Sequence, residues 1–371
     1  MNPFYIDSLR VGLGVDGYSL YVKDLKNNKI IEKFEPRDCP YDSFIVQKPN
    51  GFISFAALNW LTLHAISLTI LNWRGHVLTQ FTNEQPITPR LKIAQMKAFE
   101  DRERHIYIAK TFVQTKLWRQ REFLKNLSDS YSIEVPDLPR INTNSEDFLR
   151  NIEARYATEY FTQFGSICSE IGYRFKKRNQ TKSNMHAADL GNALLNYGYA
   201  ILQTYIRRAA NSIGLQDDIP FLHDLRTNRG LTFDLMELWR VNIDYSVLET
   251  MKQLKRSKKT HYLTDGYEVM LEPSTVRTLI DKIKLYLSME EILFNARIFA
   301  KFLLQNLKTL DFSLRPIQTK DVFEQDQVRN AILTKTAREL RMNKSSHWYQ
   351  RKRLLENNTI RLYNKSKHHF I

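Results

Sequence analysis

The stretch NEQPITPRLKIAQ, residues 83–95, marks the point at which the sequence changes from one kind of pattern to another. From Leu91 onward, long segments carry apolar residues at three- and four-residue spacing, with few glycines and with prolines confined to breaks such as VPDLPR. This spacing is typical of amphipathic helices. We therefore predict an all-α domain over residues 89–316.

Upstream of that point, the sequence alternates in short β-rich runs separated by turn-like stretches such as NN, PRDCP and PNG. Such runs are typical of strands. Between them, FAALNWLTLHA at residues 55–65 has helical spacing and predicts one short helix packed on the sheet. We therefore predict a small β-rich domain over residues 1–88. Its expected strands are YSLYVKD (18–24), KIIEKF (29–34), SFIVQK (43–48), ISLTILN (66–72) and HVLTQF (76–81).

A second break falls at SLRPIQTK, residues 313–320, and residues 331–371 contain ten Lys or Arg against two Glu. Within this tail, Thr336 and Ser345 are candidate helix caps and Asn343 a turn residue, which outlines a helix-turn-helix over residues 317–371. A basic helical tail that only contacts the DNA backbone is the alternative, because Arg341 and His347 depart from the usual pattern. The candidate DNA-binding residues are Lys344, Gln350, Arg351, Lys352 and Arg353.

The predicted fold class is therefore α+β: a small N-terminal β-domain, a larger all-α domain and a C-terminal helix-turn-helix-like module. Lysine and arginine number 55 against 40 acidic residues, a formal charge of +15, which favours a polyanionic partner such as nucleic acid. A charge that only keeps the protein soluble is the alternative. Cys39 and Cys168 fit no metal-ligand spacing, and no apolar signal or membrane segment is evident, so we expect a cytoplasmic protein without membrane association.

Residues 106–124, IYIAKTFVQTKLWRQREFL, interleave basic and apolar positions. This pattern predicts a basic stripe on a helix that otherwise faces the core. A solvated helix face and a phosphate-binding face explain the stripe about equally well. The residues concerned are Lys110, Lys116, Arg119 and Arg121.

Residues 214–240, GLQDDIPFLHDLRTNRGLTFDLMELWR, carry the residue types of a metal site. His223 follows a proline and two apolar residues, and Asp234 and Glu237 lie three apart in a helical pattern, so their carboxylates share a face and can share one ion. Glu153 adjoins the apolar face of its own helix and is the best third acid. Two carboxylates and an imidazole suit Mn²⁺ or Mg²⁺. Each residue alone is more often structural or solvated, so only the set is informative.

The segments IEARYATEYF (152–161), NALLNYGYAIL (192–202) and residues 214–240 follow one another as in a known family. In order and spacing they resemble the CRISPR-associated integrase that inserts new spacers, and its transposon relatives, the casposases. LTILNWRGHVL, RLKIAQ and IAKTFVQTK are also similar, so the resemblance spans roughly residues 10–315. It implies a β-domain followed by an α-helical catalytic domain, which agrees with the pattern of apolar residues.

Residue by residue, the resemblance implies metal ligands at Glu153, His223 and Glu237, with Asp234 as a neighbouring acid. It places Arg229 where a basic residue contacts the DNA phosphate. The asparagines and tyrosines of the second segment are expected to support the ligands by packing rather than to take part in the chemistry. These are Asn192, Asn196, Tyr197 and Tyr199.

The activity implied by the resemblance is metal-dependent attack of a DNA 3′-hydroxyl on a target phosphodiester, without a covalent protein intermediate. The basic tail favours the casposase branch, since spacer integrases generally end with the catalytic domain. The expected partners are double-stranded DNA, both element ends with inverted repeats and target DNA, and further copies of the chain. The alternatives are a CRISPR spacer integrase that works with a small partner subunit, a catalytically inactive DNA-binding protein, and a plain nuclease.

Overall fold

The computed structural model describes residues 2–316, except for 9, 37, 48–49, 83–88, 144, 177–186, 227–228, 258–261 and 265–268. The predicted helix-turn-helix over residues 317–371 lies outside the described residues. The same holds for its candidate DNA-binding residues, Lys344, Gln350, Arg351, Lys352 and Arg353.

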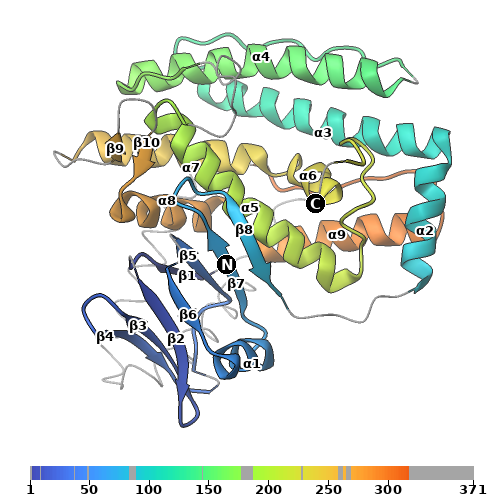
Figure 1. Cartoon of the computed structure of the whole chain (residues 1–371). Helices are drawn as coiled ribbons and strands as arrows, with labels where there is room; N and C mark the ends of the chain where they lie inside the picture. Colours follow the sequence, from blue (N-terminus) through green and yellow to red (C-terminus); the bar gives the residue numbers. More distant parts are fainter. Residues whose placement is uncertain are drawn as a thin grey trace, which may run out of the picture. The chain divides into compact units, whose positions relative to one another are not determined.

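The N-terminal strands form two four-stranded sheets (Figure 1). In the first sheet β1, β5 and β7 are parallel and β8 pairs antiparallel with β7; its strands are β1 (Pro3–Ile6), β5 (Ser43–Gln47), β7 (Ser67–Leu71) and β8 (Val77–Phe81). The second has the order β4-β3-β2-β6 and comprises β2 (Val11–Asp16), β3 (Ser19–Asp24), β4 (Lys29–Phe34) and β6 (Gly51–Ile53). Helix α1 (Phe55–Leu63) follows β6 and begins where the Ser54 side chain accepts a hydrogen bond from the Ala57 amide.

The structure confirms the five predicted strands and the short helix. It adds β1, β2 and β6, which the sequence pattern did not indicate. β2 is VGLGVD, whose two glycines weaken a strand signal, and β6 is only three residues long. β2 pairs antiparallel with its chain neighbour β3 over its whole length, and in parallel with the more distant β6.

Eight further helices and one hairpin make up the described part beyond residue 88. They are α2 (Pro89–Glu100), α3 (Arg102–Leu127), α4 (Glu146–Ile171), α5 (Leu190–Ile213), α6 (Gly230–Met236), α7 (Arg240–Lys255), α8 (Pro273–Tyr286) and α9 (Met289–Leu304), with β9 (Tyr262–Thr264) and β10 (Val269–Leu271). The helical prediction is confirmed except for that antiparallel hairpin, so the region is not all-α. Among the described helices, none combines the length and the apolar character needed to cross a membrane.

The two long helices α4 and α5 have ends that the sequence explains. The side chain of Asp189 accepts a hydrogen bond from the Asn192 amide at 2.8 Å and so caps the start of α5. Each helix ends at a glycine in the left-handed region, Gly172 with φ 100° and Gly214 with φ 90°, where a side chain would be strained. These caps fix where the tyrosines and the acid of the candidate site lie along each helix.

Helix α5 joins the helices to the first sheet. The Tyr205 hydroxyl lies 2.9 Å from Ser43 Oγ in β5, and the Arg208 guanidinium donates to the Asp42 carbonyl at 2.8 Å. From β8, the Gln80 side-chain amide donates to the Thr204 carbonyl of α5. In Figure 1 the helix runs beside β8. The β-rich and helical regions on either side of residue 88 therefore pack against each other, because the described residues 2–33 and 41–316 form one compact unit.

Candidate active site

Two predicted acids, Glu153 and Glu237, meet at a buried lysine. Glu153 lies on α4, Glu237 directly follows α6, and Lys116 reaches them from α3. The Lys116 ammonium donates to Glu153 Oε1 and lies 2.8 Å from Glu237 Oε2. The structure thus brings together two carboxylates that lie 84 residues apart in the sequence.

Two of the four residues in the predicted basic stripe on α3 are buried. Lys116 is 7% exposed and Arg119 3% exposed, so neither belongs to a solvated helix face. The Arg119 guanidinium donates to Asn242 Oδ1 at 2.9 Å and to the Arg315 carbonyl at 3.2 Å. Sequence periodicity placed these residues beside apolar positions but did not indicate the buried partners that hold them.

Glu237 is buried and nevertheless anionic. Burial raises the pKa of its carboxyl, but Arg240 first and then Lys116 lower it, and the resulting pKa is about 2. The Arg240 Nε donates to Glu237 Oε1 at 2.9 Å, across the turn between α6 and α7. Lys116 remains charged because of the same ion pairs. Burial lowers its pKa, but the charges of Glu237 and Glu153 outweigh burial and raise it. The pair of acids is thus neutralised by two cations, the buried Lys116 and the half-buried Arg240.

His223 is oriented by the fully buried Asp234. Asp234 accepts hydrogen bonds from the backbone amides of Phe221, Leu222 and His223, at 2.5, 3.1 and 3.0 Å, and from His223 Nδ1 at 2.7 Å. Because a carboxylate only accepts, Nδ1 carries a proton; in the neutral imidazole the lone pair is then on Nε2, where a metal or a proton can bind. These four bonds use about four acceptor sites of Asp234, which favours Glu237 over Asp234 as a ligand; an ion shared by the two acids stays a prediction.

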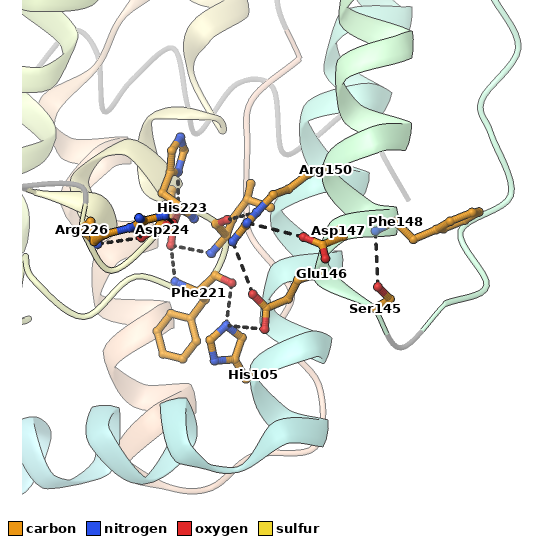
Figure 2. A network of polar contacts seen from close by, with 12 residues as sticks. His105, Ser145, Glu146, Asp147, Phe148, Arg150, Phe221, His223, Asp224 and Arg226 are labelled. Atoms are coloured by element: carbon orange, nitrogen blue, oxygen red, sulfur yellow. Dashed lines mark hydrogen bonds and ion pairs between the residues drawn. The ribbon is translucent and has the colours of Figure 1, made fainter.

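Two basic side chains fasten the segment that carries His223. Arg150, one helical turn before Glu153 on α4, donates from Nε to the Leu222 carbonyl at 3.3 Å. His105 Nε2 lies 2.8 Å from the Phe221 carbonyl. In Figure 2, Glu146 lies between Arg150 and His105 and contacts both of them. The position of His223 is therefore coupled to the helix that carries Glu153.

Asp244 is a further buried acid, and the sequence reading missed it. The hydroxyls of Tyr199 and Tyr160 each donate to its carboxylate at 2.6 Å. The Tyr199 ring also lies 4.9 Å from the Arg240 guanidinium, which in turn holds Glu237. The three-residue spacing from Glu237 to Arg240 was a visible signal for that ion pair, whereas nothing in the sequence connects Asp244 with its two tyrosines.

The remaining residues of the 192–202 segment lie in different surroundings. The Asn192 side chain bonds the Lys176 carbonyl and Asp189 at the start of α5. Tyr197 faces the turn at Gly75, where an added Cβ would collide with its ring. Asn196 is half-buried on the same helix. Tyr199 is connected to the acid cluster through Asp244 and Arg240.

Arg229 precedes α6 with φ 68°, a left-handed conformation unusual for a residue with a side chain. Burial lowers its pKa and the nearby Arg207 lowers it further, whereas Asp217 raises it. Arg207 Nε lies 3.3 Å from the Asp217 carboxylate. Two guanidinium groups thus lie near Asp217 beside α6, and a guanidinium is a donor that suits a phosphate contact.

The side chains of Glu153, Glu237 and His223 are of the types that bind a divalent ion, but their donor atoms do not surround one point. In the described part of the chain, no three His, Cys, Asp or Glu side chains lie close enough to hold an ion. Glu237 Oε2, however, is buried and has no hydrogen bond of good geometry, and His223 offers its Nε2. Carboxylate oxygens and one imidazole are ligands that Mn²⁺ and Mg²⁺ accept.

Comparison with known proteins places this geometry in a family. Residues 4–284 match the family model described as CRISPR associated protein Cas1. A CRISPR-associated endonuclease Cas1 of Archaeoglobus fulgidus is 26% identical over 263 residues, 64% of this chain and 74% of the relative. One from Thermodesulfovibrio yellowstonii is 30% identical over 272 residues, 68% of this chain and 80% of the relative.

Solved structures agree on the fold. A casposase bound to integration product is 23% identical and superposes with a TM-score of 0.74, covering 88% of this chain and 99% of that one. A Cas1 protein from Thermotoga maritima is 18% identical with a TM-score of 0.69, covering 84% of this chain and 99% of that one. On the match of the family model over most of the sequence, the chain belongs to the Cas1 family.

Proposed function

We propose that the protein is a metal-dependent DNA integrase of the casposase branch, which joins the 3′-hydroxyl ends of mobile-element DNA to target DNA by transesterification. The observation that carries the proposal is the buried, anionic Glu237 paired through Lys116 with the half-buried Glu153, together with His223, whose Nδ1 is held by Asp234. The likeness to the casposase structure and the basic tail seen in the sequence support the choice of branch.

In this proposal, Glu153, Glu237 and His223 hold the ion, Mn²⁺ or Mg²⁺. When bound, the ion supplies activation of the attacking oxygen and offsets charge on the phosphate. The chain itself keeps the imidazole in the required tautomer through Asp234, and Arg229 contacts a backbone phosphate.

No covalent protein intermediate is part of the proposal. The tyrosine hydroxyls described near the acids, those of Tyr160 and Tyr199, are buried and bonded to Asp244, so neither is available as a nucleophile. The expected partners are double-stranded DNA, as element ends with inverted repeats and as target. Because two ends must be joined in one event, further copies of the chain are expected in the complex.

The test is an integration assay with the purified chain, labelled duplexes that carry inverted repeats, and a plasmid target in Mn²⁺. Glu153→Gln, His223→Ala and Glu237→Gln should each abolish covalently joined product and retain DNA binding. Glu159→Gln, an exposed acid on the same helix as Glu153, is the matched control and should retain activity. Cleavage without joining indicates a plain nuclease, and DNA binding by the unsubstituted chain with neither cleavage nor joining in Mn²⁺ indicates an inactive DNA-binding protein.

A second candidate is a CRISPR spacer integrase, which the names of the curated relatives favour. Its chemistry is the same, and only the DNA and the partner differ. If joining requires a small second subunit and a repeat array, and inverted-repeat ends are not inserted by the chain alone, this candidate replaces the casposase.

A further inference from the structure

Both carboxylate oxygens of Glu237 face a cation in this structure. Oε1 accepts from Arg240 Nε at 2.9 Å, and Oε2 lies 2.8 Å from the Lys116 ammonium. A divalent ion bound to either oxygen lies about 2.1 Å from it. It would then be within a few ångströms of one of these cations, in a buried site where water screens their repulsion poorly. One cation must therefore leave Glu237 for an ion to bind there.

Lys116 is held less firmly than Arg240. Arg240 also lies over the Tyr199 ring, and Asp244 adds a further attractive charge. Within the described residues, the Lys116 ammonium has Glu153 and Glu237 as its ion-pair partners. A lysine is a compact charge on a flexible four-carbon stem, whereas a guanidinium is planar and fixed by its several donors. The group that can move at the smaller cost is Lys116.

We propose that the Lys116 ammonium occupies the metal site when no metal is bound and acts there as the counter-ion of the two acids. In the metal-free protein its ammonium holds Glu153 and Glu237 together, and it leaves Glu237 when a divalent ion binds. This inference rests on the proposed function, since it takes the same two acids as ligands. It adds a positioning role for a residue that the sequence placed only in a basic stripe.

Charge balance gives the displaced ammonium a destination. Glu153 and Glu237 supply two negative charges, and Lys116 and Arg240 supply two positive ones. An added divalent ion leaves the cluster with an excess of positive charge, which the phosphates of bound DNA can offset. The ammonium that leaves Glu237 has the chemistry to contact such a phosphate.

The first experiment is calorimetric titration of Mn²⁺ into the full chain without DNA. Lys116→Met should bind Mn²⁺ at least about tenfold more tightly than the unsubstituted protein, because the competing charge is gone. Its melting temperature should be lower in EDTA and should rise more on addition of Mn²⁺. Lys125→Met removes the same charge from an exposed position on the same helix and should change neither value.

The outcomes separate this inference from the proposed function. Equal or weaker Mn²⁺ affinity in Lys116→Met overturns the counter-ion role and leaves the metal site standing. Absence of Mn²⁺ binding in both proteins overturns the metal site and the inference with it.

A second measurement needs no substitution and covers the case in which Lys116→Met does not fold. Acetylation of lysines in the unsubstituted protein is followed by mass spectrometry in EDTA and in Mn²⁺. Lys116 should be protected in EDTA and should react several-fold faster in Mn²⁺, while Lys125 reacts equally in both. Equal protection of Lys116 in the two conditions contradicts the proposal.

Discussion

At the scale of single residues, Asp234 has two structural roles. It fixes the backbone of residues 221–223 through three amides, and it sets the proton of His223 through Nδ1. Loop shape and imidazole tautomer therefore depend on one carboxylate. A substitution there should affect stability and the availability of Nε2 together.

We expect Asp234→Asn to lower the free energy of unfolding by about 1–3 kcal/mol, because an amide has one acceptor oxygen and its NH₂ would face backbone donors. Affinity for Mn²⁺ should fall about 10- to 100-fold, as is typical when the partner of a ligating histidine is lost. Urea denaturation and calorimetric titration measure the two effects. Asp224→Asn in the same segment is the control, since Asp224 bonds the exposed Arg226; equal losses in both variants would contradict the role of Asp234.

Residue type and spacing predicted the set Glu153, His223, Asp234 and Glu237, and the family resemblance narrowed the ligands to three of them. The structure brings the two glutamates together. Their use as ligands stays a prediction. Lys116 and Asp244 could not be found in this way, because their partners lie on other helices and helical spacing says only that a residue faces inward. What a buried charge meets across a helix interface is decided by tertiary packing.

At the scale of elements, two opposite faces of α5 contact different parts of the protein. Tyr197 and Tyr199 are two residues apart, about 200° around a helix, so they point to opposite sides. Tyr197 meets the turn at Gly75, and Tyr199 meets Asp244 and Arg240. The helical pattern was visible in the sequence, but most of the circumference of α5 is buried, so the pattern does not show which buried side faces which partner.

This pair offers a matched test on one helix. Tyr199→Phe should lower the free energy of unfolding by about 1–3 kcal/mol, because the buried Asp244 loses a donor. Tyr197→Phe should be neutral or slightly stabilising, since its hydroxyl is buried without a hydrogen-bond partner among the described residues. Chemical denaturation of the two variants side by side decides the point. A larger loss for Tyr197→Phe would show that the two faces are assigned wrongly.

At the scale of the whole molecule, tyrosine phenols buried in the packed interior resist ionisation. Burial raises the pKa of Tyr245 to about 12, and it raises the pKa values of Tyr160, Tyr197 and Tyr205 well above the ordinary value. A pKa that is higher in the folded than in the unfolded state stabilises the fold below the unfolded value, about pH 10. That contribution is lost as the pH rises through the folded-state values.

We therefore expect two phases in a titration of tyrosinate absorbance between about pH 9 and pH 12. Exposed tyrosines ionise first, and the buried ones ionise in a steep step that coincides with loss of the helical circular-dichroism signal. The urea-unfolded chain should titrate in one phase near pH 10. A smooth rise of absorbance completed before any loss of helix would contradict the burial of these phenols.

The broad fold was predictable from the change of periodicity at residues 83–95, because strands and helices have different apolar spacing. The strands β1 and β6 were not, since they are short and pair with distant segments; β2 contains two glycines, which weaken its strand signal although it pairs with the neighbouring β3. The change of pattern also gave no information about packing between its two sides.

That packing limits how the protein can be shortened. A fragment starting after residue 88 would keep every proposed ligand, yet it would expose the face of α5 on which Tyr205 and Arg208 now meet Ser43 and Asp42. The same helix positions Tyr199 under the arginine that holds Glu237. The first sheet is therefore part of the scaffold of the acid cluster, and a minimal version of the enzyme has to retain it.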